Sequence, residues 1–158
     1  KGDRAVAGMG TTFTGIELHD GVARLAHVGD SRAYRFRGGA LEPLTEDHTL
    51  VGELVRSGDL DEAAARAHPQ RSVLLRCIGT EATVEVDEGL VELADGDRLL
   101  LCSDGLTEML DSGAVAAILG ETAGDPDAAA ERLIAAANDA GGTDNITVIV
   151  LDVVEAAP

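Results

Sequence analysis

The sequence predicts an α+β domain built in layers. Three observations indicate this class: strand-like runs separated by glycine turns fill the chain as far as Glu42, two short helical patterns follow, and further strands surround one long helix near the end. This order of strands, small helices, strands, helix and strand favours a layered α+β domain over a doubly wound parallel sheet. We expect a single domain, because a chain of 158 residues falls within the usual domain size.

Composition limits the kinds of partner that the domain can have. Hydrophobic residues make up 45% of the chain, which is enough for a core, and only 2% of residues are aromatic. The 12 basic and 29 acidic side chains give a formal net charge of -17. Such a surface disfavours binding to nucleic acids and to anionic membranes, because both need basic side chains that neutralise phosphate. Divalent cations are more suitable partners for such an acidic surface.

The first part of the chain is predicted to be mainly strand. Residues Thr11–Leu18 and Val22–Val28 are separated by Asp20-Gly21, a dipeptide that favours a tight hairpin turn. Residues Ser31–Phe36 form a third strand-like run, which turns back through the glycine pair Gly38-Gly39.

The character of the chain then becomes helical. Leu50 and Leu54 have helical spacing, and Asp61 begins a second, alanine-rich helix that ends near Pro69. We therefore expect a helical insertion at about residues 48–70, between two groups of strands.

Strand-like composition returns after the insertion. It marks Ser72–Ile78, Thr83–Val86, Arg98–Cys102 and Ile146–Val154. The run Arg98–Cys102 contains three consecutive leucines, which predicts a central strand covered on both faces.

The best-defined helix precedes the last strand. Asp125 is a predicted N-cap and Pro126 occupies the first helical position, while Gly141 is placed where a C-terminal cap is expected. Between them, Leu133 and Ala137 share one apolar face.

Three aspartates lie where a predicted strand meets a turn. Asp30 and Asp104 each follow a strand, and Asp144 precedes the last one. Carboxylates are hard oxygen ligands suited to Mg²⁺, Mn²⁺ or Ca²⁺, so three of them meeting at strand ends would favour a cation site. The alternative is that each simply caps a turn beside a glycine. Spacing along the sequence does not decide between these two interpretations.

The motifs around these aspartates resemble those of a known family, the metal-dependent Ser/Thr protein phosphatases of type 2C (PPM), and in particular its bacterial branch. Six segments occur in the family's order across nearly the entire chain: Gly8-Met9-Gly10-Thr11-Thr12, His27-Val28-Gly29-Asp30-Ser31-Arg32, Leu44-Thr45-Glu46-Asp47-His48, His68-Pro69-Gln70-Arg71-Ser72, Cys102-Ser103-Asp104-Gly105-Leu106 and Gly142-Thr143-Asp144-Asn145. Any one of these segments is weak evidence, whereas the ordered set is specific.

The resemblance implies an αββα sandwich of two antiparallel sheets flanked by helices, with a metal site at one edge. Residues 1–158 then correspond to the later part of a catalytic domain whose beginning is absent, and the helical insertion becomes a flap beside the site. Carried over by position, Asp104 and Asp144 are implied ligands of two catalytic Mn²⁺ or Mg²⁺ ions. Asp104 and Asp30 are implied ligands of a third ion, with Ser72 as a further contact.

The implied activity is hydrolysis of phosphoserine and phosphothreonine on proteins by a metal-bridged water. The expected partners are phosphoproteins, including Ser/Thr kinases, and no nucleic acid or membrane. We expect a cytoplasmic location, because no apolar run is long enough to span a membrane and no signal region follows Lys1. Cys77 and Cys102 lack a Cys-x-x-Cys pair and are predicted to be buried, reduced thiols.

The sequence departs from the family in one respect. It contains no Asp-Gly-x-Gly-Gly segment, whose Asp would bridge the two metals. The family places that segment upstream of Lys1, so we expect the missing N-terminal portion as a separate piece or as residues beyond this sequence. The alternative is a catalytically incomplete, phosphatase-like domain with a binding or regulatory role.

Other chemistries fit the sequence less well. A serine nucleophile at Ser31, with His48 or His68 as base, would need a helix after the serine, whereas the pattern there is a strand. Neither cysteine has the arginine six residues later that a cysteine phosphatase requires. The histidines lack the i, i+4 pairing of a helical zinc site, so structural roles are expected for them.

Overall fold

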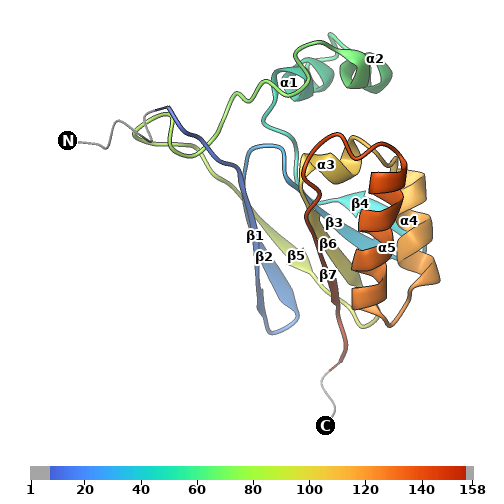
Figure 1. The fold of residues 1–158 in the computed structure, drawn as a ribbon. Coiled ribbons are helices and arrows are strands. Elements are labelled where there is room, and N and C mark those ends of the chain that lie inside the picture. Colours follow the sequence, from blue (N-terminus) through green and yellow to red (C-terminus); the bar gives the residue numbers. More distant parts are fainter. Residues whose placement is uncertain (1–7, 156–158) are drawn as a thin grey trace.

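The computed structural model describes residues 8–155 as two antiparallel sheets with helices packed against one of them (Figure 1). The first sheet has the order β1-β2-β5 and contains β1 (Phe13–His19), β2 (Val22–Val28) and β5 (Asp87–Glu92). Asp20 and Gly21 form the predicted hairpin turn between the first two strands. Their φ angles of 46° and 77° are both positive, as a two-residue type I′ turn requires.

The second sheet has the order β4-β3-β6-β7. Its strands are β3 (Arg32–Arg37), β4 (Ala40–Pro43), β6 (Arg98–Cys102) and β7 (Val148–Asp152). The central position predicted for Arg98–Cys102 is confirmed, because β6 pairs with β3 on one side and with β7 on the other. The last strand is shorter than its predicted range.

Five helices complete the described chain. They are α1 (Leu50–Arg56), α2 (Glu62–Ala67), α3 (Asp104–Thr107), α4 (Ser112–Glu121) and α5 (Pro126–Asp139). Aspartate side chains accept hydrogen bonds from backbone N–H groups at the starts of α2, α4 and α5, including the predicted N-cap Asp125. The two helices expected between residues 48 and 70 are therefore present. Their role as a flap stays a prediction.

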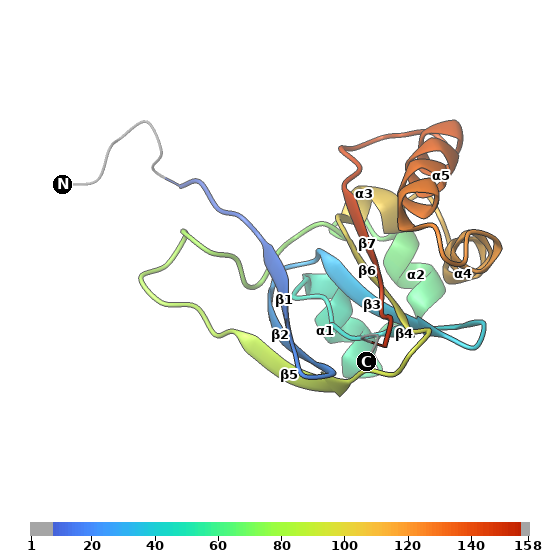
Figure 2. The ribbon, with the colours of Figure 1, turned by 90° about the horizontal axis from the view of Figure 1, so that it is seen from below.

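The helices are distributed unevenly over the sandwich. Helices α4 and α5 lie on the outer face of the second sheet, and α1 and α2 lie together at one end (Figures 1 and 2). No helix of the described residues covers the outer face of the first sheet. Three of the four layers expected for an αββα sandwich are thus present in residues 8–155.

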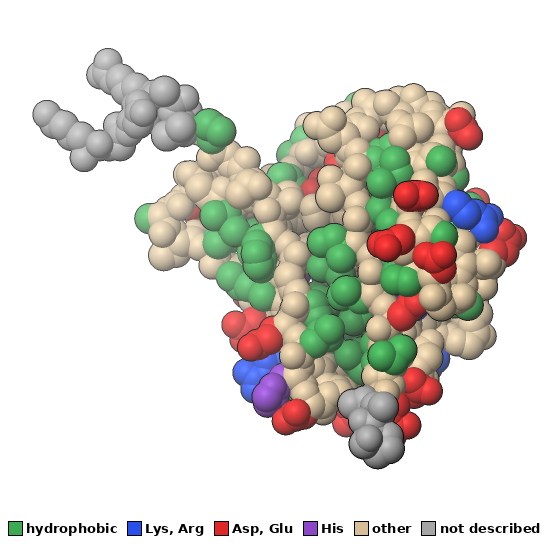
Figure 3. Space-filling view, turned by 60° about the horizontal axis from the view of Figure 1, so that its bottom comes forward, with side chains coloured by type: hydrophobic (Ala, Val, Ile, Leu, Met, Phe, Trp, Pro, Cys, Tyr) green, Lys and Arg blue, Asp and Glu red, His purple; other side chains and the backbone are tan. Residues whose placement is uncertain are grey.

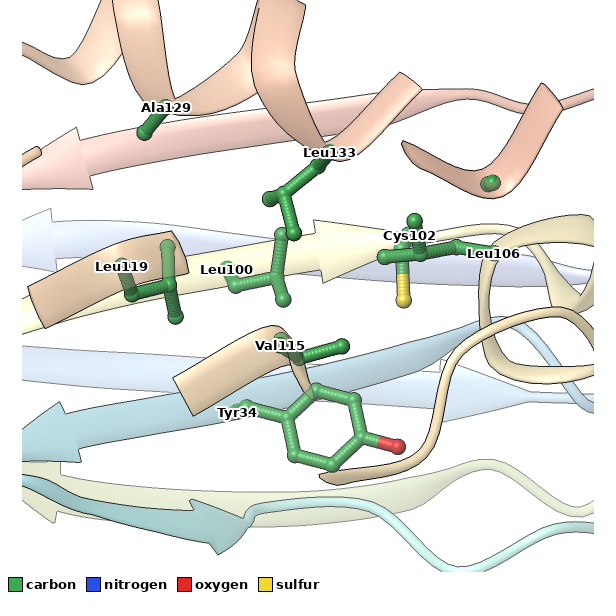
Figure 4. Close-up of a cluster of buried hydrophobic side chains, with 9 residues drawn as sticks. Tyr34, Leu100, Cys102, Leu106, Val115, Leu119, Ala129 and Leu133 are labelled. Carbon is green, nitrogen blue, oxygen red and sulfur yellow. The ribbon is translucent and has the colours of Figure 1, made fainter. Parts of the chain in front are cut away.

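The main core lies between the second sheet and helices α4 and α5 (Figure 4). Leu100 and Cys102 point from β6 into the same cluster as Leu119 of α4 and Leu133 of α5. The opposite face of β6 carries Leu99, which is completely buried on the side of the first sheet. Strand β6 is therefore covered on both faces, which explains its apolar sequence.

Three sequence predictions on this part of the chain were wrong. Residues Ser72–Ile78 and Thr83–Val86 form no strand and make only isolated bridges, at Leu74 and Ile78. The strand that pairs with β2 on the side away from β1 is instead β5, whose residues alternate between half-buried and exposed at a sheet edge. Because the segment before β5 lies outside both sheets, Cys77 is only partly buried, whereas Cys102 is buried as predicted.

Apolar side chains remain exposed on the first sheet and beside it. Exposed fractions reach 50% for Phe13 and Leu18, 74% for Leu90 and 52% for Ile149 of β7. Figure 3 shows hydrophobic side chains gathered in the middle of the face that it presents. An open hollow of about 840 Å³ crosses the outer face of the first sheet, where Phe13 and Leu90 line it. None of the helices in the described part of the chain is long and apolar enough to span a membrane.

Candidate metal centre

Asp30 follows β2 after one intervening residue, Gly29, whose backbone conformation requires glycine. Gly29 has φ of +114°, and a Cβ atom there would lie 2.3 Å from Thr12 Cγ2. The turn is also tied to the residue before β1, since the hydroxyl oxygens of Thr12 and Ser31 lie 2.9 Å apart. Burial, together with the negative charges of Asp104 and Asp47, raises the pKa of Asp30 to about 6.

Asp104 is the first residue of α3 and follows β6 after one intervening residue. One of its carboxylate oxygens accepts a hydrogen bond of 2.9 Å from the backbone N–H of Gly105. Burial raises the pKa of Asp104, and the negative charges of Asp144 and Glu108 raise it further. The end of the central strand β6 thus holds the Asp104 carboxylate near the charge of Asp144.

The loop that carries Asp144 is joined directly to the start of α3. The Ser103 hydroxyl donates to the carbonyl of Asn145 and accepts from the N–H of Thr147, both at 3.0 Å. A Cβ atom at position 105 would lie only 2.4 Å from the Asn145 carbonyl oxygen, so the close approach of the two segments requires glycine. Asp144 itself is exposed and accepts from the N–H of Asn145 at 2.7 Å.

The three aspartates therefore belong to one electrostatic group, although they come from different sheets. Asp30 is influenced by Asp104, and Asp104 by Asp144. Ser72 is not part of this group: it is exposed in the turn after α2 and makes no hydrogen bond to the aspartates within the described range. Its place as a metal contact stays a prediction.

The donor chemistry of this group fits a divalent cation, but the number of donors is small. Carboxylate oxygens are the ligands that Mn²⁺ and Mg²⁺ prefer, and a cation would relieve the repulsion between Asp30 and Asp104. In residues 8–155, however, no three His, Cys, Asp or Glu side chains are grouped closely enough to hold a metal ion. Asp30, Asp104 and Asp144 can therefore form only part of a complete coordination shell.

The arginines near the group are paired with acidic side chains. Arg32 donates to both carboxylate oxygens of Asp47 at 2.7 Å and to the Tyr34 hydroxyl at 3.3 Å. Burial alone would lower the pKa of Arg32, but its pairing with Asp47 raises it. Arg71 lies 3.3 Å from Glu108, which follows α3, and so connects the segment after α2 to the end of that helix.

The rival sites considered from the sequence do not form. Ser31 contacts Thr12 and precedes strand β3, so the strand-to-helix turn of a serine hydrolase is absent. His27 and His48 are buried with their rings 4.6 Å apart, and both are hydrogen-bonded to the protein, as expected for structural histidines. Sequence patterns gave no indication that Ser103 and His48 fix the loops of the site, because their partners are distant in the chain.

Comparison with protein families identifies the chain. A family model described as Stage II sporulation protein E (SpoIIE) matches residues 54–154, which is well over half of the sequence. The chain belongs to the SpoIIE and type 2C group of metal-dependent protein phosphatases, the PPM family. The PPM segments found in the sequence contain the same three aspartates, Asp30, Asp104 and Asp144.

Individual relatives agree with the assignment to the PPM family. The protein phosphatase PhpP of Streptococcus pneumoniae is 43% identical over 153 residues, which cover 97% of this chain and 62% of PhpP. The crystal structure of the Mycobacterium tuberculosis serine/threonine phosphatase PstP/Ppp superposes with a TM-score of 0.87 at 39% identity, over 94% of this chain and 62% of that one.

One solved structure also bears on the metal. The catalytic domain of the serine/threonine protein phosphatase PstP, in complex with two manganese ions, matches with a TM-score of 0.84 and 38% identity. That match covers 94% of this chain and 61% of PstP. The chain spans 57% to 62% of the length of the first curated relatives that it matches.

Proposed function

We propose that this PPM chain provides the larger part of a metal-dependent protein phosphatase that hydrolyses phosphoserine and phosphothreonine on proteins. The observation that carries the proposal is that the PPM motifs carry Asp30, Asp104 and Asp144 at strand ends of two sheets, where burial and the charge of a neighbouring aspartate raise the pKa values of Asp30 and Asp104. Groups of carboxylates with raised pKa values are typical of cation-binding and catalytic sites.

The ions proposed for the site are two Mn²⁺ or Mg²⁺, held by Asp104 and Asp144, and a third held by Asp104 and Asp30. When bound, such ions lower the pKa of a bridging water that attacks phosphorus and offset negative charge on the phosphoryl oxygens. The part of this chain is to hold the carboxylates in place: Ser103 joins the start of α3 to the Asp144 loop, and the tight turn at Gly29 leads into Asp30. The manganese ions of PstP support this assignment.

The substrates proposed are phosphoproteins, including Ser/Thr kinases, in the cytoplasm of a bacterium. Support comes from relatives named as protein phosphatases or Ser/Thr phosphatases, which are bacterial. A flap formed by α1 and α2 would lie beside the entrance for the phosphoprotein, since the segment after α2 contacts Glu108 through Arg71. The net charge of -17 disfavours nucleic acid as a partner.

The complete enzyme would need further residues. The small number of metal ligands indicates that residues are missing, because the described residues offer no group of three metal ligands. The exposed apolar side chains point the same way: Phe13 and Leu90 lie on an uncovered sheet face, and Leu18 and Ile149 lie on the edge strands β1 and β7. We propose that the N-terminal portion carried by longer relatives covers these surfaces and completes the metal site.

An alternative function deserves a test of its own. The sequence lacks the Asp-Gly-x-Gly-Gly segment, so the chain could act as a regulatory, phosphatase-like domain that binds phosphoproteins without hydrolysing them. Retention of all three aspartates favours the enzyme.

The experiment is hydrolysis of p-nitrophenyl phosphate and of a phosphothreonine peptide with Mn²⁺, with and without a chelator. It uses the longer protein in which this chain is joined to the proposed N-terminal portion. The matched variants are Asp104→Asn and Asp125→Asn, since Asp125 only caps helix α5 and asparagine caps equally well. We expect hydrolysis that the chelator abolishes, that Asp104→Asn loses and that Asp125→Asn retains. Binding of the phosphopeptide without hydrolysis would support the regulatory alternative instead.

A further inference from the structure

His48 holds the turn that carries Asp30 by two hydrogen bonds, one to each backbone group of Gly29. The N–H of His48 donates to the Gly29 carbonyl at 2.8 Å, and the N–H of Gly29 donates to His48 Nδ1 at 3.1 Å. The imidazole ring is completely shielded from solvent. No other side chain in the described residues receives the Gly29 N–H, so the geometry of the turn depends on this ring.

These contacts define the tautomer of His48. A backbone N–H can only donate, so Nδ1 must carry a lone pair and the ring proton must reside on Nε2. Nε2 lies 3.0 Å from Asp87 Oδ2, and it therefore donates to that carboxylate. Asp87 thus selects the tautomer that can accept from Gly29. This is the way in which a carboxylate commonly orients an imidazole.

Asp87 is in turn fixed by Arg76. The guanidinium donates to Asp87 Oδ1 at 2.6 Å. Partial burial raises the pKa of Asp87, but hydrogen bonds from Arg76 and His48 hold this pKa below its usual value. Arg76 belongs to the segment that follows α2, and the N–H of Leu75 in that segment donates to the carbonyl of His48 at 2.8 Å. One chain of contacts therefore links the residues after α2 to the Asp30 turn.

We propose that His48 is a positioning residue for Asp30, held in its required tautomer by Asp87 and Arg76. The proposal rests on the proposed function, since it assumes that Asp30 binds a divalent ion. His48 does not touch the ion or the substrate. It holds the backbone immediately before Asp30 and connects this turn to the segment that leaves the two small helices.

Two substitutions at position 48 separate the two hydrogen bonds of the ring. In His48→Asn the side-chain amide can place an oxygen near the position of Nδ1 and accept from Gly29, whereas the bond to Asp87 is lost. In His48→Gln the longer amide reaches towards Asp87 and leaves Gly29 without an acceptor. Mg²⁺ is the probe, and the readout is the Mg²⁺-dependent shift of the side-chain carboxyl ¹³C resonances of Asp30 and Asp104 in the 158-residue chain.

We expect His48→Gln to need about tenfold more Mg²⁺ for the shift at the Asp30 carboxyl carbon, as is usual for residues that support metal ligands. The shift at Asp104 should persist, and His48→Asn should restore most of the shift at Asp30. A general loss of stability would weaken both shifts equally and would overturn the proposal. Equal behaviour of His48→Gln and wild type would also overturn it. Absence of any Mg²⁺-dependent shift in wild type would instead contradict the proposed function.

Asp87 provides a second test that does not disturb the buried ring. Its side chain is 46% exposed on an edge strand, so substitutions there should fold. Asp87→Asn retains an oxygen that accepts from His48, whereas Asp87→Leu removes it. We expect ¹⁵N spectra to show His48 with its proton on Nε2 in wild type and Asp87→Asn. Asp87→Leu should show a mixture of tautomers together with a weaker Mg²⁺-dependent shift at the Asp30 carboxyl carbon. An unchanged tautomer and an unchanged shift in Asp87→Leu would contradict the positioning role.

Discussion

Asp30 and Asp104 follow strands of opposite sheets, and the negative charge of Asp104 nevertheless raises the pKa of Asp30. Asp30 also precedes β3, and Arg32 at the start of β3 pairs with Cys102 at the end of β6, which places Asp30 and Asp104 at the same end of this strand pair. Such an arrangement is unfavourable for a folded chain without a cation, since each ionised group raises the cost of ionising the other. The metal centre is therefore expected to lower the stability of the metal-free protein.

The first prediction concerns stability as a function of pH. The pKa of Asp30 is raised from 3.8 to about 6 in the folded chain, so the folded state holds this proton more tightly than the unfolded state does. Its contribution to stability is fully present below pH 3.8 and is lost as the pH rises through about 6. Asp30→Asn should therefore unfold at higher urea concentration than wild type at pH 7, and the difference should vanish near pH 4.

The control for this prediction is Asp125→Asn, which alters an exposed capping carboxylate. It should shift the urea midpoint equally at both pH values. A wild-type protein more stable than Asp30→Asn at pH 7 without metal would show that the Asp30 carboxylate is not under electrostatic strain.

The second prediction concerns the close contact between α3 and the Asp144 loop. Gly105→Ala places a Cβ atom 2.4 Å from the Asn145 carbonyl oxygen, so one of the two backbone segments must move. We expect a loss of about 1–3 kcal/mol in the free energy of unfolding, together with weaker Mn²⁺ binding. Gly120→Ala in α4 is the matched control, since its Cβ would meet Phe36 at an ordinary 3.5 Å. If both variants bound Mn²⁺ as wild type does, the contact would not position the aspartates.

The third prediction concerns Arg98, which is buried beside the main core. Its guanidinium forms a fork with Asp152 and donates to the carbonyls of Leu119 and Thr122 at 2.8 Å, at the end of α4. Arg98→Met leaves Asp152 and these carbonyls without a partner, so we expect a loss of about 3–5 kcal/mol in urea unfolding. Arg132→Met removes an exposed pair with Glu121 and should cost less than about 1 kcal/mol. Similar losses in both variants would contradict this account of Arg98.

The parts of the fold that sequence could predict are those fixed by neighbouring residues. The Asp20-Gly21 turn and helix α5 follow from local preferences, namely positive φ angles and an Asp-Pro start. Helix α4 escaped prediction because Gly113 and Gly120 lower its helix propensity. Strand β5 escaped because its pairing with β2, instead of its own composition, makes it a strand.

The site likewise has features that neighbouring residues fix and features that depend on contacts between distant parts of the chain. Sequence patterns place each aspartate at the end of a strand, but whether the ends meet depends on how two sheets pack, and the motif resemblance supplied that expectation. The supporting contacts join residues far apart in the chain: Ser103 with Asn145, and His48 with Asp87. Hydrogen bonds of this kind leave no periodic pattern in the sequence, so they became visible only in the folded structure.

The most direct test of the metal centre is equilibrium binding of Mn²⁺ to the 158-residue chain, followed by the electron paramagnetic resonance signal of the free ion. Wild type, Asp104→Asn and Asp125→Asn are compared at pH 7, above the pKa of about 6 for Asp30. We predict saturable binding in wild type and in Asp125→Asn, and a loss of at least about tenfold in affinity in Asp104→Asn. Equal binding by all three proteins would mean that the acidic surface attracts the ion without a defined site, and would contradict the proposed metal centre.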